Sequence, residues 1–474
     1  MRTFEMVTGI INVLMLGWFI LPVRRSQRAL LIGLAVSAIA VVTHGLIEGM
    51  RWQMIPIYAI TFIPIVVLAV RLLTKPKQEA KKRSRIRLVL AVVLASLYAI
   101  IAMALPLLLP VFTFEKPAGP YAIGTVTYNW IDEHREETFT PESGDKRKLA
   151  VQIWYPADKD ARRTPAPYVS DGGIYAEGLS QFLEMPKLLF TAFGHVKTHA
   201  AVNADISNRE SAYPVLLFSH GFGMYKSQNN FQIEQLVSQG YIVVGFNHTY
   251  SSAATIFDDG QVAYYVAQDK ESSDYLDGAN EGWVEDAKFV LDQLEEIAAK
   301  HSEGRFAGRM DMEKIGMFGH SFGGATSTQL LMTDDRIKAA INMDGILYGK
   351  LRIPEEGLQK PFLLMSADRS LSIVQDIADR EQAEMIARML TRYERVPVGG
   401  NYWLTIHDSD HAAFSDFYLL SPLIERMAGV HIRQVHRIIN DYSLDFFDHY
   451  LKQQPSRLLE HNIGEHPEYT LQRG

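Results

Sequence analysis

The chain has 474 residues, of which 47% are hydrophobic and 21% charged, and this length allows two or three globular domains. Its formal net charge of −7 at pH 7 argues against nucleic acid as a partner, because binding a phosphate backbone needs a concentrated basic surface. It contains no cysteine, which excludes disulfides, thiolate metal ligands and cysteine nucleophiles.

Four long apolar runs dominate the first 114 residues. Each is close to the ~20 residues that a helix needs to cross a bilayer, and the second run is the weakest. The runs are Met6–Val23, Ala29–Thr43, Met54–Leu73 and Leu88–Phe114. We therefore expect residues 1–114 to form an all-α, four-helix transmembrane region in the cell membrane.

Basic residues are distributed unevenly between these runs. One group follows the first run and comprises Arg24, Arg25 and Arg28. A larger group lies between the third and fourth runs and comprises Lys75, Lys77, Lys81, Lys82, Arg83, Arg85 and Arg87. The positive-inside rule places both loops in the cytoplasm, so the N-terminus and everything after Phe114 are expected on the outer face.

Two alternatives remain open for the apolar runs. The first run could be a cleaved signal peptide, although its basic flank follows the apolar stretch instead of preceding it. The runs also carry no charge pairs of the kind expected in a transporter, which leaves a purely anchoring role open.

The sequence changes character after Phe114. "EKPAGP" (Glu115–Pro120) is a short linker, and beyond it strand-like apolar runs alternate with helical stretches. The expected strands are Leu149–Ala157, Tyr213–Gly223, Tyr241–His248, Lys314–His320, Lys338–Asp344, Pro361–Asp368 and Asn401–His407, and the expected helices are Asn229–Gln239, Glu285–Lys300 and Gly324–Met332. This alternation predicts one α/β domain over residues 115–474, with a mostly parallel sheet and helices on both faces.

The stretch "FGHSFGG" (Phe318–Gly324) places a serine among glycines. A Gly-x-Ser-x-Gly match arises by chance in about one in seven chains of this length. Here, however, the motif follows a strand and begins a helix, as a nucleophile elbow requires. The glycines let strand and helix pack closely, and the helix N-terminus favours negative charge that develops in the reaction. Ser321 is therefore the candidate nucleophile.

A serine hydroxyl needs a base and an acid that orients the base. Asp344 and Asp368 each end an expected strand after the elbow, and the pattern alone leaves both open as the acid. For the base, His407 and His411 follow in the order Ser, Asp, His that is typical of this fold. His407 falls within a strand pattern, so His411 in the following loop is the better candidate. A histidine base predicts a rate that falls as the pH drops.

An oxyanion hole needs two backbone N–H donors. The amide that follows the nucleophile belongs to Phe322, and the glycine-rich "SHGFG" (Ser219–Gly223) offers the amide of Phe222 as the second donor. An ordinary strand-to-helix glycine turn is the alternative interpretation of this segment.

Several of these segments together resemble the platelet-activating factor acetylhydrolases of the plasma type and their bacterial α/β-hydrolase relatives. They are "PVLLFSHGFG", "GYIVVGFNH", "GHSFGGAT", "INMDG" and "DHAAFSDF". The likeness covers most of residues 150–420, and Gly178–Ala200 resembles the segment that precedes the sheet in that family. The four-helix N-terminal region departs from the plasma enzymes, so the mechanism carries over more securely than the substrate.

The resemblance implies an α/β-hydrolase fold and the hydrolysis, without a metal ion or other cofactor, of short or oxidised acyl groups at the sn-2 position of phospholipids. It implies that Ser321 is the nucleophile, His411 the base, and Asp344 in preference to Asp368 the acid, with the amides of Phe222 and Phe322 as oxyanion donors. Dienelactone hydrolases are similar in outline, but they normally use a cysteine nucleophile, which this chain lacks.

The expected partners are thus a lipid or small acyl ester and the membrane, with no nucleic acid, and the sequence leaves the oligomeric state open. Two other functions remain as alternatives: a general carboxylesterase or polyesterase acting on non-lipid esters, and a membrane sensor whose hydrolase-fold domain only binds a ligand. The apolar segment Gly178–Gly194 fits either a surface that caps the pocket or dips into the membrane, or a pair of helices packed on the core.

Overall fold

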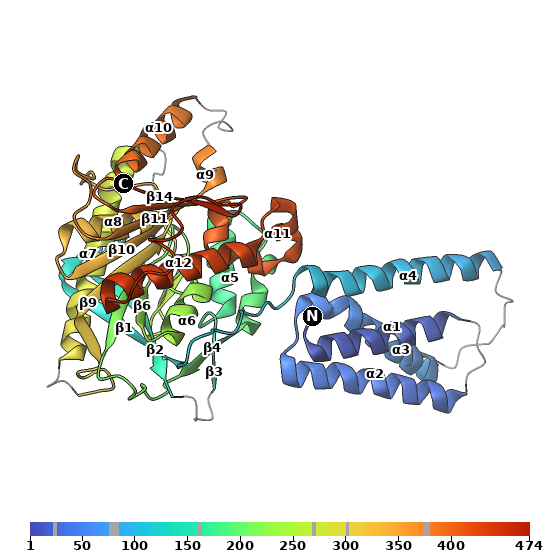
Figure 1. Cartoon of the computed structure of the whole chain (residues 1–474). Helices are drawn as coiled ribbons and strands as arrows, with labels where there is room; N and C mark the ends of the chain where they lie inside the picture. Colours follow the sequence, from blue (N-terminus) through green and yellow to red (C-terminus); the bar gives the residue numbers. More distant parts are fainter. Residues whose placement is uncertain (22–25, 75–84, 159–163, 268–271, 300–302, 373–379) are drawn as a thin grey trace. The chain divides into compact units, whose positions relative to one another are not determined.

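The computed structural model describes the chain except for residues 22–25, 75–84, 159–163, 268–271, 300–302 and 373–379. The chain divides into two compact units, a helical one built mainly from Met1–Phe112 and a larger one made of Thr113–Leu419 and Ile424–Gly474 (Figure 1).

Four long helices make up the first unit: α1 (Thr3–Ile20), α2 (Gln27–Glu48), α3 (Ile55–Thr74) and α4 (Arg85–Leu108), with a short 3-10 turn at Trp52–Met54. All four are long and apolar enough to cross a membrane, which indicates that the protein associates with one. The four apolar runs thus form helices as expected. Of the basic residues that predict orientation, Arg28 lies in α2 and Arg85 and Arg87 in α4. The others, Arg24, Arg25, Lys75, Lys77, Lys81, Lys82 and Arg83, lie outside the described residues.

A buried ion pair flanks the apolar runs of this unit. Glu5 in α1 is fully buried and accepts two hydrogen bonds from the guanidinium of Arg51, at 2.6 and 2.9 Å. His44 of α2 is also buried, and its Nε2 lies 2.7 Å from the hydroxyl of Tyr58 in α3. These contacts tie the helices together through polar groups, which is the expected way to bury charge in a membrane protein.

The larger unit contains a twelve-stranded sheet (Figure 1). Its strands, in spatial order, are β13 (Gly464–Glu465), β14 (Tyr469–Arg473), β12 (Tyr402–Ile406), β11 (Phe362–Ala367), β10 (Ile337–Met343), β9 (Met310–His320), β5 (Tyr213–Ser219), β6 (Ile242–Phe246), β2 (Lys146–Ala157), β1 (Ala122–Glu136), β4 (Lys197–Val202) and β3 (Pro165–Pro167). The consecutive strands from β12 to β6 run parallel, whereas the two flanks are mainly antiparallel. A separate hairpin pairs β7 (Ala254–Ile256) with β8 (Val262–Tyr264).

Helices cover both faces of the sheet. The helices that the structure describes in this unit are α5 (Gly172–Leu183), α6 (Asn230–Ser238), α7 (Ser273–Ala298), α8 (Phe322–Thr333), α9 (Asp368–Ser372), α10 (Arg380–Leu390), α11 (Pro422–Ala428) and α12 (Ile432–Lys452). Residues of α6 and α12 pack in one hydrophobic core, and residues of α7 and α8 pack in another. Strand β5 contributes side chains to both cores, because successive side chains of a strand point to opposite faces of the sheet. Leu216 and Phe218 belong to the first core, and Val215 and Leu217 belong to the second.

These observations confirm the expected fold class, an α/β-hydrolase sheet preceded by four apolar helices. Every strand and helix expected from the sequence is present, with ends that differ by a few residues, except that α7 begins twelve residues before the expected Glu285. Strand β2 pairs antiparallel with β1 at one flank of the sheet. The apolar pattern of its sequence did not reveal this antiparallel pairing.

The segment Gly178–Gly194 forms the end of α5 and two 3-10 turns, Lys187–Leu189 and Thr191–His195. Leu179, Phe190 and Phe193 are buried, while Leu188 is exposed. None of these residues lines the cavity beside Ser321, so the segment packs on the domain instead of capping the catalytic pocket.

Candidate active site

Ser321 occupies a strained turn between β9 and α8. Its φ and ψ are 58° and −125°, a combination that costs about 1–3 kcal/mol in a residue other than glycine. Its N–H donates to the carbonyl of Met343 at 2.9 Å, which fixes the turn against the end of β10. A Cβ at Gly319 would lie 2.2 Å from the carbonyl oxygen of Gly323, so only glycine allows the strand and the helix to meet this closely.

Three of the residues singled out in the sequence converge on this turn. The hydroxyl of Ser321 lies 2.9 Å from Nε2 of His411, and Nδ1 of His411 lies 2.7 Å from Oδ2 of Asp344. His411 begins a 3-10 turn (His411–Phe414) after β12, and Asp344 directly follows β10. The geometry allows Ser321 to donate to His411 while His411 donates to the Asp344 carboxylate, which is the arrangement of a Ser-His-Asp triad.

Asp344 is held as a carboxylate from several sides. Its side chain is 2% exposed, and it also accepts hydrogen bonds from the amide of Ala367 at 2.8 Å and the hydroxyl of Ser370 at 2.6 Å. Burial alone would raise its pKa, but these bonds and the one from His411 outweigh burial and lower it.

Two other residues named from the sequence, Asp368 and His407, lie apart from the triad. Asp368 accepts the backbone N–H groups of Asp408 and Ser409, at 2.9 and 3.1 Å, and so clamps the loop that leads to His411. His407 contacts β14 through Thr470, as expected for a packed strand residue. The geometry therefore favours Asp344 over Asp368 and His411 over His407.

The pKa of His411 is raised above 6.5. The protein that surrounds the half-exposed ring would lower the pKa, but the hydrogen bond to Asp344 and the negative charge of Asp344 outweigh this effect. Because the neutral ring is the form that can accept a proton, we expect kcat/KM to fall as the pH drops, with a midpoint above 6.5. A pH profile of kcat/KM on a neutral ester tests this, and a rate that stays constant between about pH 5 and 8 would contradict it.

The two amides expected to bind an oxyanion come from segments that meet at Ser321. A Cβ at Gly221 would lie 3.1 Å from the Cβ of Ser321, so the glycine-rich loop runs against the nucleophile. The rings of Phe222 and Phe322 lie 4.2 Å apart between centroids, and both residues line the same cavity as Ser321.

That cavity has a volume of about 400 Å³ and is mainly apolar. Besides the triad and the two phenylalanines, it is lined by Leu276, Ile346, Tyr348, Ser370, Leu371, Ile386, Leu390 and Tyr393. Ile386 and Leu390 come from α10. An apolar wall next to a nucleophile suits the acyl part of an ester.

A buried glutamine connects the parts of this site, and sequence reasoning missed it. Oε1 of Gln228 accepts the N–H of Gly221 at 2.8 Å, and its Nε2 lies 2.7 Å from Nδ1 of His320. Nε2 of His320 in turn lies 3.0 Å from the carbonyl of His411. Burial first, and then the charge of His411, lowers the pKa of His320 to about 3, so this ring stays neutral. No motif marks Gln228, because its partners lie up to 92 residues away.

Replacing Gln228 with leucine should lower kcat by about 10- to 100-fold while KM changes little. The glycine-rich loop and His411 would lose their shared support, and misplacement of reacting groups by about 1 Å can cost this much. Steady-state kinetics on a soluble ester would measure the two constants separately. If the variant had a lower Tm but an unchanged kcat, Gln228 would have a purely structural role instead.

A second hydrogen-bonded series of serine, histidine and aspartate begins at Ser219, the last residue of β5. Nε2 of His248 lies 2.9 Å from the hydroxyl of Ser219, and its Nδ1 lies 2.8 Å from Asp286. All three residues are fully buried, so Ser219 is out of reach of a substrate. Arg147 donates to Asp286 at 2.7 Å and to Glu137 at 2.9 Å, and completes a polar cluster that braces the ends of β5 and β6.

Replacing Arg147 with methionine should lower the free energy of unfolding of the larger unit by about 3 kcal/mol or more. The change would leave Glu137 without its guanidinium partner in a buried position and weaken the charge balance at Asp286. Urea unfolding followed by tryptophan fluorescence would measure the loss. Replacing the exposed Arg395 with methionine serves as the control, since its ion pair with Glu355 is at the surface and such pairs contribute little.

The fold and the site define a hydrolase of the α/β-hydrolase class. Among solved structures, a ferulic acid esterase from Streptomyces cinnamoneus is similar with a TM-score of 0.59 and 28% identity, over 77% of this chain and 100% of that one. The sequence profile described as platelet-activating factor acetylhydrolase, isoform II, matches residues 110–301 and 293–457. The chain belongs to this family, which confirms the resemblance seen in the sequence, and it is a carboxylic ester hydrolase.

Individual proteins with similar sequences are named as acetylhydrolases or esterases. A platelet-activating factor acetylhydrolase from Cavia porcellus is 25% identical over 370 residues, which cover 72% of this chain and 78% of that protein. The corresponding protein from Canis lupus familiaris is 27% identical over 64% of this chain and 68% of its own length. A protein from Arthroderma benhamiae, named a probable 1-alkyl-2-acetylglycerophosphocholine esterase, is 26% identical over 50% of this chain and 60% of its own length.

Proposed function

We propose that the protein is a membrane-anchored serine esterase that removes short acyl groups from phospholipids. The observation that carries this proposal is the continuous hydrogen-bonded chain from Ser321 through His411 to Asp344, which opens into an apolar cavity. The names of the relatives, which include an acetylglycerophosphocholine esterase, support a short-chain phospholipid as the substrate.

In the proposed mechanism, His411 accepts the hydroxyl proton of Ser321 as the serine oxygen attacks the ester carbonyl. Asp344 holds the ring of His411 with Nε2 toward the serine and stabilises the imidazolium that forms. The amides of Phe222 and Phe322 stabilise the oxyanion. His411 then donates its proton to the leaving alcohol, and a water molecule, activated by the same ring, releases the acid from the acyl-enzyme.

For the membrane, we propose that residues 1–114 form the spanning region and residues 115–474 the catalytic domain on the outer face. The four apolar helices support the first part, and the distribution of basic residues in the sequence supports the orientation. An anchored enzyme meets substrate at the bilayer surface, where lipid esters are concentrated.

The test is the initial rate of hydrolysis against acyl length, from acetyl to palmitoyl at the sn-2 position, for the full chain and its Ser321→Ala variant. A steep preference for short acyl groups that disappears in the variant would support the proposal. Serine-dependent activity on soluble esters alone would identify a general carboxylesterase or polyesterase, an alternative that the likeness to a ferulic acid esterase favours. Failure of a fluorophosphonate to label Ser321 would favour the non-catalytic sensor.

A further inference from the structure

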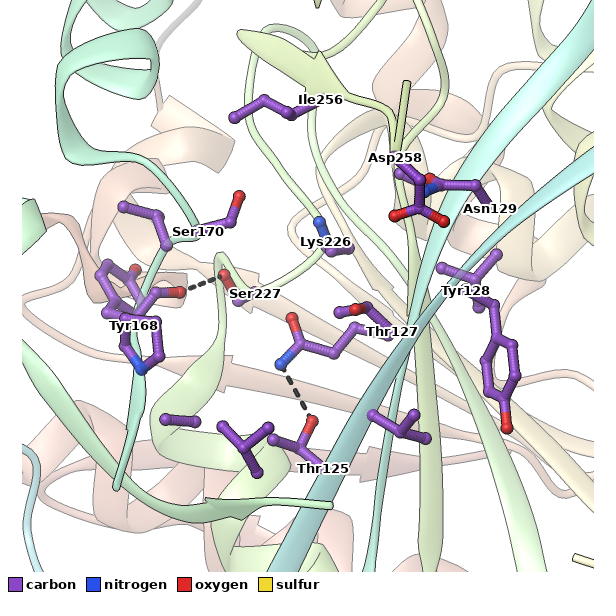
Figure 2. A pocket seen from close by; sticks show the side chains of 18 of the residues that line it. Thr125, Thr127, Tyr128, Asn129, Tyr168, Ser170, Lys226, Ser227, Ile256 and Asp258 are labelled. Atoms are coloured by element: carbon purple, nitrogen blue, oxygen red, sulfur yellow. Dashed lines mark hydrogen bonds between the residues drawn. The ribbon is translucent and has the colours of Figure 1, made fainter. Parts of the chain in front are cut away.

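A second cavity lies in the larger unit, at the flank of the sheet that contains β1 and β2 (Figure 2). Its volume is about 370 Å³, which falls in the range of small-molecule sites. Strands β1 and β2 form one wall. The others come from residues 166–170, 226–227 and 256–258, together with Tyr175, Val202 and Asn203. It shares no lining residue with the cavity beside Ser321, so a molecule bound there is a second ligand and not the ester under attack.

Lys226 gives this cavity its chemistry. The residue is only 8% exposed, and Figure 2 shows its side chain extending into the hollow. Its ammonium group makes no hydrogen bond or ion pair with any residue that the structure describes. An ammonium group at a cavity wall that pairs with no carboxylate of the described residues attracts negative charge, so the position suits an anion from outside the chain.

The backbone around Lys226 is fixed by hydrogen bonds, so the lysine stem leaves the chain from a defined point of the cavity wall. The N–H of Lys226 donates to Oδ1 of Asn247 at 2.8 Å, and the next residue, Ser227, donates its hydroxyl to the carbonyl of Tyr168 at 3.0 Å. Both Lys226 and Ser227 are buried. The structure therefore anchors the stem of a cationic side chain at the cavity wall.

The rest of the wall mixes apolar side chains with polar ones, and its lining includes one carboxylate, that of Asp258. Asn129 and Ser170 can donate hydrogen bonds, and Gln152 is held by a 3.0 Å bond from its Nε2 to the hydroxyl of Thr125. Asp258 is exposed, forms no ion pair with Lys226, and lies at the side of the cavity where water can solvate it. A ligand that fits must place negative charge at Lys226 and an uncharged or cationic end toward Asp258.

We propose that this cavity binds a small organic anion, with the carboxylate or phosphate of the ligand on Lys226. Two sources supply such chemistry beside an esterase: the carboxylic acid released by hydrolysis, and the phosphate of a phospholipid headgroup. The site goes beyond the proposed catalytic function, and its test does not require turnover.

The test is isothermal titration calorimetry on the full chain in detergent, with acetate and glycerophosphocholine as separate probes. At least one probe should bind, and Lys226→Met should weaken that binding about tenfold or more, because it removes a charge-assisted hydrogen bond. Acetate alone would identify the released acid as the ligand, and glycerophosphocholine alone the lipid headgroup. Lys360→Met is the control, since Lys360 already pairs with Asp335 outside this cavity.

A second variant guards against misfolding of Lys226→Met. Thr127 is an exposed residue of β1 that lines the cavity, and a strand tolerates an aromatic side chain there, so Thr127→Trp should block the cavity without touching the lysine. It should reduce binding of the same probe about tenfold or more, with Tm close to that of the parent protein. No heat of binding for either probe, or binding that is equal in both variants and the control, would overturn the proposal.

Discussion

Replacing Ser321 with alanine should reduce kcat for ester hydrolysis by about 10⁵- to 10⁶-fold. Alanine removes the hydroxyl group that lies 2.9 Å from Nε2 of His411 and attacks the carbonyl carbon in the proposed mechanism. Loss of a triad nucleophile lowers kcat by this much in serine hydrolases, and the rate acceleration that remains comes from the oxyanion donors and from substrate binding. Rates with a chromogenic butyrate ester on the purified full chain would measure the loss, and labelling by a fluorophosphonate should vanish in parallel.

Ser219→Ala is the matched control for this experiment. Ser219 also lies beside a histidine that contacts an aspartate, but it is fully buried. The control variant should still react with the fluorophosphonate. If labelling persisted in Ser321→Ala and disappeared in Ser219→Ala, the assignment of the nucleophile would be wrong.

Replacing Asp344 with asparagine should lower kcat by about 10⁴-fold while the fold is kept. Asparagine fits the same space, but it can donate a hydrogen bond to Nδ1 of His411, which favours the tautomer with its proton on Nε2, facing Ser321. The variant should also lose the raised pKa of His411, because the carboxylate that raises it is gone. Steady-state rates, and the pH at which kcat/KM reaches half its plateau, would measure both effects.

Asp368→Asn provides the comparison. Asp368 holds the loop before His411 by accepting one backbone N–H on each carboxylate oxygen, and the amide oxygen of asparagine can still accept one of these two bonds. We expect Asp368→Asn to lower kcat by less than about tenfold. A loss of this size agrees with a residue that positions the loop and not with the acid of the triad. Equal losses in the two variants would reopen the choice between the two aspartates.

The local patterns of the sequence predicted the sheet and the elbow well. A continuous apolar strand such as β5, a glycine-flanked serine and a following helix are all readable within a dozen residues. The choice between Asp344 and Asp368 was not readable in this way, since both end a strand. Only the backbone turn at Asp344, with φ at 52°, directs its side chain to His411, and before the structure the preference rested on the family resemblance.

Contacts between distant segments were out of reach of the sequence. Gln228 and Lys226 are polar residues in a stretch that looks like an ordinary loop, and their roles depend on partners or cavities built by other strands. The long strand β1 was missed because its outer half is polar and exposed at the flank of the sheet. The orientation across the membrane stays a prediction, since most of the basic residues behind it lie outside the described residues.

The strained backbone of the elbow sets a limit on how this protein can evolve or be engineered. Ser321 and Asp344 both have positive φ, at 58° and 52°, a conformation that glycine adopts with less strain than other residues. A screen that rewards heat resistance alone would therefore enrich glycine at the two positions that the reaction needs most. Stabilised versions of this enzyme must gain their heat resistance elsewhere, and any selection for them has to include turnover as a second criterion.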